Sequence, residues 1–83
     1  MHNMSEIKPT ETLDVFGLIC PVPVYLTAQK IKELKVGDIL EIVATDEGAV
    51  KDIPVWAKES GNKVVGFVER NNAYVFYVQK LVE

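Results

Sequence analysis

The sequence predicts an α/β two-layer sandwich in which a mixed four-stranded sheet carries two helices on one face. Several short segments have the alternating apolar side chains of β-strands. Between the first three of these segments lie two segments whose apolar residues recur at helical spacing. The expected element order is therefore β-α-β-α-β-β. A length of 83 residues, with 48% apolar and 25% charged side chains, suits one small globular domain with a thin stability margin.

The N-terminal part of the chain is expected to precede the folded domain. Residues 1–10 show no apolar period, so we expect a flexible leader there, followed by a single domain over residues 11–83. From Thr12 to Phe16 apolar and polar side chains alternate, which predicts the first strand, and Gly17 ends it.

The first helix is expected to begin at Pro23 and to end at Gly37. Proline suits a first helical turn, because the N–H that it lacks would have no partner there. Apolar and small residues then recur at spacings of three and four and define a core face: Val24, Thr27, Ala28, Ile31 and Leu34. Lysines gather near the expected end, where cations suit the helix dipole, and Gly37 can end the helix.

The strand expected from Asp38 to Thr45 carries apolar side chains on both faces, which indicates a central place in the sheet. A second helix should follow, and Pro54 restricts where it can begin. With Asp52 as its N-cap, Pro54 falls in the first turn, Trp56 lies on the core face and Gly61 ends the helix.

The last two strands are expected over Lys63–Arg70 and Ala73–Lys80. Asn71 and Asn72 separate them, and asparagine tolerates positive φ, so the pattern predicts a tight hairpin. Aromatic side chains on these strands could stack on single-stranded bases, but they are not interleaved with basic residues and the chain has a net charge of −3. We therefore expect no direct contact with nucleic acid.

Several other classes of protein are excluded by simple counts. The uncharged run from Val15 to Gln29 is too short to span a bilayer and contains two prolines, so we expect no membrane segment. The polar N-terminus does not resemble a secretory signal, and a cytoplasmic location is expected. Cys20 is the one cysteine, and His2 lies in the leader, so neither an internal disulfide nor a metal site is expected.

Cys20 stands directly before the first expected helix. Unpaired N–H groups and the positive end of the helix dipole favour a thiolate at such a position. Pro21 and Pro23 stiffen the loop and remove two competing donors. A reactive thiol must be weighed against the other common role of a lone cysteine, that of a small buried apolar side chain.

The segment around this cysteine resembles a known family. Residues 13–23, with the sequence Leu-Asp-Val-Phe-Gly-Leu-Ile-Cys-Pro-Val-Pro, are similar to the signature of the TusA/SirA-like sulfur-carrier proteins, which ends in Cys-Pro-x-Pro. The similarity continues through residues 36–38, 45–46 and 52–54 to the closing hairpin, and so covers about Thr12 to Leu81.

The resemblance implies a protein that carries sulfur covalently and does not act as an enzyme with catalytic turnover. Cys20 would hold sulfane sulfur as a persulfide, and Pro21 and Pro23 would restrict the loop around it. In this family the sulfur comes from a cysteine desulfurase or a rhodanese-type sulfurtransferase. It then passes to an acceptor protein serving tRNA thiolation, cofactor biosynthesis or sulfur oxidation. With one cysteine, the outer sulfur can leave only when another nucleophile attacks it. We expect transient protein partners, a monomer and no cofactor.

Three residues of the first helix are candidates for partner docking. Tyr25 and Leu26 are expected outside the core stripe, one turn from Cys20, and Lys30 about a turn farther on the same side. The alternative is that all three are ordinary surface residues. Asp14 is expected to be structural or exposed, because a carboxylate beside the thiol would oppose its ionisation.

Two other functions remain open at this point. In a thiol-based redox-sensing or regulatory module, oxidation of Cys20 would change the affinity for a partner. In a plain interaction domain, the cysteine would be inert.

Overall fold

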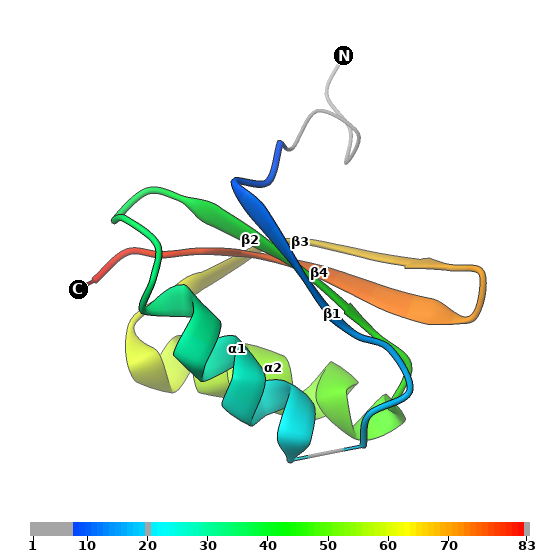
Figure 1. Cartoon of the computed structure of the whole chain (residues 1–83). Coiled ribbons are helices and arrows are strands. Elements are labelled where there is room, and N and C mark those ends of the chain that lie inside the picture. The colour runs from blue at the N-terminus through cyan, green and yellow to red at the C-terminus, as the bar shows by residue number, and fades with distance from the viewer. Residues whose placement is uncertain (1–7, 20, 83) are drawn as a thin grey trace.

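The computed structural model describes residues 8–19 and 21–82, which form four strands and two helices in the expected order (Figure 1). The elements are β1 (Glu11–Val15), α1 (Val22–Ile31), β2 (Ile39–Ala44), α2 (Glu47–Ser60), β3 (Lys63–Arg70) and β4 (Ala73–Gln79). Most of the expected leader lies outside the described residues. Its last residue, Thr10, donates its backbone N–H to the Ile39 carbonyl at 2.6 Å, so strand pairing begins there.

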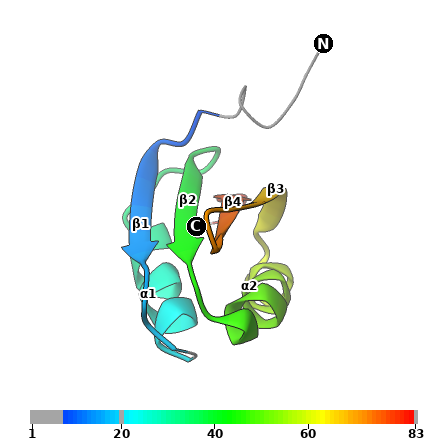
Figure 2. The ribbon, with the colours of Figure 1, turned by 90° about the vertical axis from the view of Figure 1, so that its right-hand side faces the viewer.

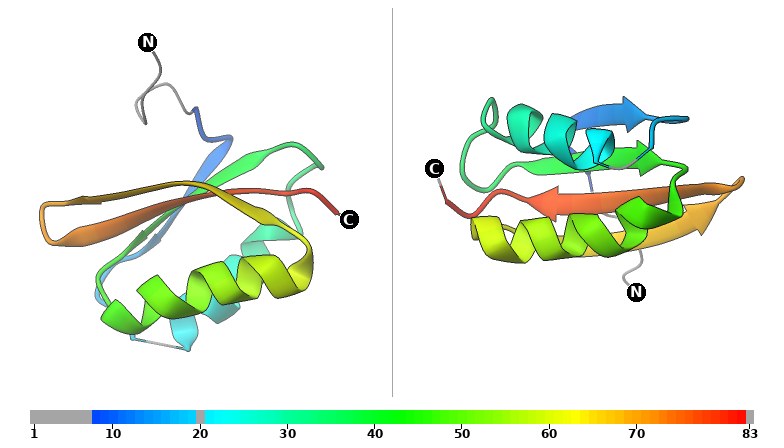
Figure 3. Two further views of the ribbon diagram at one scale, coloured as in Figure 1. Left: turned by 180° about the vertical axis from the view of Figure 1, so that it is seen from behind. Right: turned by 90° about the horizontal axis from the view of Figure 1, so that it is seen from below.

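The four strands form one mixed sheet in the order β1-β2-β4-β3. β1 is parallel to β2, whereas β4 is antiparallel to both β2 and β3. Both helices cover the same face, with α1 beneath β1 and β2 and α2 beneath β4 and β3 (Figures 2 and 3). The predicted fold class and the central place of β2 are therefore confirmed.

The core lies between the sheet and the helices. Leu40, Ile42 and Ala44 of β2 are fully buried, as their alternation predicted. On β4, Phe76 pairs with Ile42 and belongs to the same buried cluster. Ile53 and other residues of the predicted core faces of the helices complete this cluster, so helical spacing identified the helix residues that pack on the sheet.

Helix α1 ends at Ile31, well before the predicted end at Gly37. The chain instead tightens into i→i−3 hydrogen bonds, in which the Leu34 N–H donates to the Ile31 carbonyl at 3.1 Å. This turn buries Leu34, and the Asp38 carboxylate accepts a hydrogen bond from the Lys35 N–H at 2.9 Å. Packing of Leu34 and the return to β2 therefore end the helix before the glycine.

Helix α2 begins at Glu47, so the prediction of Asp52 as its N-cap was wrong. Asp46 is the N-cap, and its carbonyl accepts the Ala49 N–H at 3.0 Å. Pro54 lies inside the helix, although it leaves one carbonyl of the preceding turn without the usual N–H. The longer helix buries Ala49 completely, which offsets part of that loss.

The other two turn predictions are confirmed. Gly61 adopts φ 86° and ends α2, while the Asn62 N–H reaches back to the Ala57 carbonyl at 2.8 Å. Asn71 and Asn72 have φ of 52° and 63° and connect β3 to β4. No helix in the described ranges has the length and apolar character needed to cross a membrane.

Candidate functional site

The two prolines of the Cys-Pro-x-Pro motif lie at the amino end of α1, where Pro21 is the N-cap and Pro23 belongs to the first turn, and residues 16–19 form the loop that follows β1 (Figure 1). Cys20 itself lies outside the described residues. The site is therefore defined by Ile19 and Pro21 on either side of it, by the loop that follows β1 and by the first turn of α1.

Three hydrogen bonds fix the loop that follows β1. The Phe16 N–H donates to the Asp14 carboxylate at 2.9 Å, which gives Asp14 the structural role expected for it. The Leu18 N–H donates to the Val15 carbonyl at 3.1 Å. The Gly17 N–H donates to the Thr45 hydroxyl at 2.9 Å, so the loop is tied to the residue that follows β2.

A glycine is favoured at position 17 because of its backbone conformation, and not because a side chain there would clash with its neighbours. Its φ is 82°, in the region that favours glycine, whereas a Cβ built on it would meet no atom within 4 Å. Glycine therefore lets the loop turn toward α1 without the backbone strain that most other residues would have at this φ.

The first turn of α1 uses most of its own amides. The Val22 N–H donates to the Ile19 carbonyl at 3.0 Å, so this amide is already engaged. Pro23, buried in the first turn, has no N–H to offer, and the Tyr25 N–H donates to the Pro21 carbonyl at 3.0 Å. Two amides at the start of α1 are therefore already engaged, so fewer of its N–H groups are unpaired than the sequence suggested.

Large apolar side chains surround the motif at the surface. We define the apolar rim as the exposed residues Phe16, Leu18, Ile19, Val22 and Tyr25. Phe16 is 61% exposed, Ile19 70% and Tyr25 62%, values that are high for side chains of this size. Clustered exposed apolar side chains are typical of surfaces that contact other proteins.

Sequence reasoning identified only Tyr25 among the residues of the apolar rim. The signal that was missed is the uncharged apolar run from Phe16 to Val22, which follows neither strand nor helix spacing. Apolar residues without a period have no core face to occupy, so several of them remain at the surface.

The three docking candidates of α1 differ in their surroundings. Tyr25 is exposed as expected, and its hydroxyl accepts a hydrogen bond from the Gln29 amide at 2.9 Å. Leu26 is half-buried and packs against the core cluster, so its expected position outside the core stripe was wrong.

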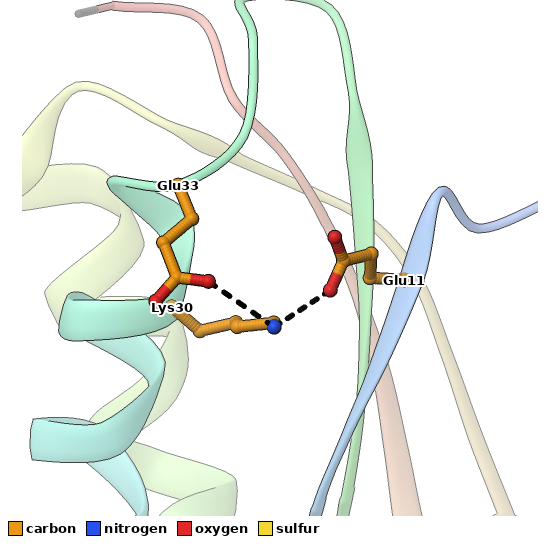
Figure 4. Close-up of polar contacts among 3 residues, drawn as sticks. All are labelled: Glu11, Lys30 and Glu33. Atoms are coloured by element: carbon orange, nitrogen blue, oxygen red, sulfur yellow. Dashed lines mark hydrogen bonds and ion pairs between the residues drawn. The ribbon is translucent and has the colours of Figure 1, made fainter.

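Lys30 is engaged within the chain, contrary to the solvated side chain expected. Its ammonium lies between two carboxylates, at 2.6 Å from Glu11 Oε1 of β1 and 3.3 Å from Glu33 Oε1 (Figure 4). Hydrogen bonds to Glu11 and then to Glu33 raise the pKa of Lys30 above 10.5. Lys30 therefore joins the end of α1 to the edge strand of the sheet.

A shallow groove of about 270 Å³ begins at the motif and runs between the two helices. Its lining residues are Pro21, Val24, Asp52, Val55, Trp56 and Glu59. Trp56 is half-buried and packs against the core, as predicted, and it also lines this groove. Within residues 8–19 and 21–82, no group of three or more His, Cys, Asp or Glu side chains could hold a metal ion.

Known proteins share both the sequence pattern and the fold. A family model described as sulfurtransferase TusA matches residues 11–80. A putative sulfur carrier protein of Aquifex aeolicus is 35% identical over 80 residues, or 96% of this chain and 41% of the relative. The putative sulfur carrier protein YrkF of Bacillus subtilis is 45% identical over 60 residues, or 72% of this chain and 32% of the relative. The chain thus spans less than half the length of these two proteins.

A third relative has nearly the same length as the matched segment. The putative sulfur carrier protein YrkI of Bacillus subtilis is 36% identical over 74 residues, which cover 89% of this chain and 99% of the relative. The crystal structure of a SirA-like protein from Desulfitobacterium hafniense superposes with a TM-score of 0.77 at 19% identity, over 87% of this chain and 99% of the other. That structure shares the fold. The family-model match over residues 11–80 shows that the chain belongs to the TusA sulfurtransferase family.

Proposed function

We propose that this chain is a sulfur carrier that holds sulfane sulfur as a persulfide on Cys20 and passes it to an acceptor protein. The observation that carries the proposal is the Cys-Pro-x-Pro motif at the amino end of α1 in a member of the TusA family. Relatives that span most of the chain are themselves named sulfur carriers. The acceptor would serve tRNA thiolation, cofactor biosynthesis or sulfur oxidation.

The proposed transfer needs no oxidant and no second cysteine. The Cys20 thiolate attacks the outer sulfur of a donor persulfide, a new S–S bond forms, and the donor S–S bond breaks. Its electron pair leaves with the donor thiolate. An acceptor thiolate then attacks the outer sulfur on Cys20 and releases the Cys20 thiolate, so each handover returns the carrier to its starting state.

The surroundings of the motif support this role. Pro21 and Pro23 restrict the backbone of the first turn, and Ile19 and Pro21, the neighbours of Cys20 in the sequence, are both exposed. The apolar rim offers a surface on which a cysteine desulfurase or a rhodanese-type donor, and later the acceptor, would dock in turn. Tyr25 belongs to that surface. Leu26 and Lys30 contribute mainly to the fold.

Intact-mass spectrometry tests the proposal directly. After incubation with a cysteine desulfurase and cysteine, the protein should gain about 32 Da per bound sulfur, and a reductant should remove it. The Cys20→Ser variant, shown to be folded by circular dichroism, is the control and should gain nothing. A wild-type protein that gains only steps of about 16 Da would point to the redox-sensing alternative and contradict the carrier role.

A further inference from the structure

The side chain of Lys80, the residue after β4, is buried at the end of the molecule that is farthest along α1 from the motif. It is 7% exposed, and its Nζ donates to the Leu34 carbonyl at 2.6 Å. An ammonium group has three N–H donors, and a buried charge is costly without a counter-charge. Within residues 8–19 and 21–82, no carboxylate lies within ion-pair distance of Lys80, since the ion pairs there are those of Lys30.

Two further lysines face the same cavity. Lys32 and Lys35, from the turn that follows α1, line a cavity of about 570 Å³ together with Lys80, Leu34 and Val36. No acidic residue is among the lining side chains. The Asp38 carboxylate is engaged by the Lys35 backbone N–H. Three lysines thus line one space, Lys80 buried and Lys32 and Lys35 exposed, and this positively charged lining would attract an anion.

A second, more apolar cavity of about 190 Å³ adjoins the first. It lies between the carboxyl-terminal halves of α1 and α2, and its lining residues are Ala28, Ile31, Lys32, Trp56, Ser60, Asn62, Lys80 and Val82. Lys32 and Lys80 belong to both cavities. The charged space and the apolar space therefore share part of their lining, and the combination fits a ligand with an anionic head and a short apolar part.

We propose that Lys80, Lys32 and Lys35 form a binding site for a small oxyanion, a carboxylate or a phosphate ester, whose apolar substituent lies between α1 and α2. The anion supplies the counter-charge for Lys80 and accepts the donors that the Leu34 carbonyl leaves free. This site is separate from the Cys20 loop and does not depend on the sulfur-carrier proposal. The alternative is that Lys80 only caps the turn after α1.

Binding is tested with the whole 83-residue chain at constant ionic strength, by NMR and by the fluorescence of Trp56, the one tryptophan of the chain. The probes are hexyl phosphate, hexanoate, inorganic phosphate and hexylammonium. Hexyl phosphate, hexanoate or both should shift the amides of residues 32–36 and 80 saturably and change the Trp56 signal. The two arms separate a phosphate ligand from a carboxylate ligand. Hexylammonium should do neither, because it carries the wrong charge.

The contributions of the alkyl chain and of the lysines to the binding affinity can be measured separately. Inorganic phosphate should bind about tenfold more weakly than hexyl phosphate if two methylene groups are buried, with no change in Trp56 fluorescence. Lys32→Gln should weaken binding about tenfold, because one charge-assisted hydrogen bond is lost. Lys51→Gln, which removes an equal charge from an exposed position of α2, should not. No saturation by about 10 mM of either hexyl anion would overturn the proposal, as would equal effects of Lys32→Gln and Lys51→Gln.

Discussion

The backbone at Gly17 allows the folding role and the functional role of the motif loop to be separated. In Gly17→Ala the new Cβ meets no atom within 4 Å, so the whole cost comes from φ 82°. An L-residue in the left-handed region lowers the free energy of unfolding by about 1–2 kcal/mol. For a domain of this size that corresponds to a fall in Tm of about 4–16 °C. The loop can avoid this strain only by changing its path, which moves Ile19 and Pro21 relative to α1.

Gly37 provides a matched control at the other end of α1. Its φ is 98°, and a Cβ there would also meet no atom within 4 Å, so Gly37→Ala carries the same kind of strain. Both variants should lose similar stability in thermal unfolding. Only Gly17→Ala should also slow the rate at which Cys20 accepts sulfur from a desulfurase, followed by intact mass below the Tm of both variants. Equal transfer rates in the two variants would refute the idea that the loop path positions the motif.

Three other predictions concern the helices and the apolar rim. Pro54→Ala should stabilise the protein by about 1–2 kcal/mol in urea unfolding, because residue 54 regains an N–H for the Val50 carbonyl; a loss of stability would contradict this. Lys30 has a pKa raised by its two glutamate partners, so its contribution is complete below pH 10.5 and is lost as the pH rises through the higher folded value. Wild type should therefore lose more stability than Lys30→Met as the pH rises above 10.5, measured by urea unfolding at each pH, and parallel curves would count against the ion pairs. Ile19→Asp should weaken donor binding at least about tenfold by calorimetry, whereas Phe67→Asp, on an exposed position of β3, should leave it unchanged. Equal affinities for the two variants would remove the rim from the docking surface.

Periodicity and turn chemistry predicted most of the fold, because these signals are local. Leu40, Ile42 and Ala44 alternate and all three are buried, and Asn71 and Asn72 form the tight turn that their tolerance of positive φ allows. The start of α2 was missed for a local reason as well. Pro54 was treated as a boundary, whereas burial of Ala49 one turn earlier favours a longer helix.

The candidate site was only partly predictable. The motif and its place before α1 can be identified from the sequence, but the hydrogen bond from the Val22 N–H to the Ile19 carbonyl cannot. The pair between Lys30 and Glu11 joins residues that are far apart in the chain, so no local pattern reveals it. The cavity around Lys80 was missed for the same reason, since its lysines meet only after the sheet has formed.

The place of β1 at the border of the sheet affects how the motif loop can behave. This strand has five residues and pairs on one side only, with β2, while its first residue is fastened to α1 through Lys30. Short peripheral strands open at lower free energy than central ones, so β1 amides should exchange with deuterium sooner than those of β2. The motif loop is thus attached to a strand that should open more readily than the centre of the sheet. In the proposed carrier role, the loop could adapt to the donor and then to the acceptor while the interior of the protein stays intact.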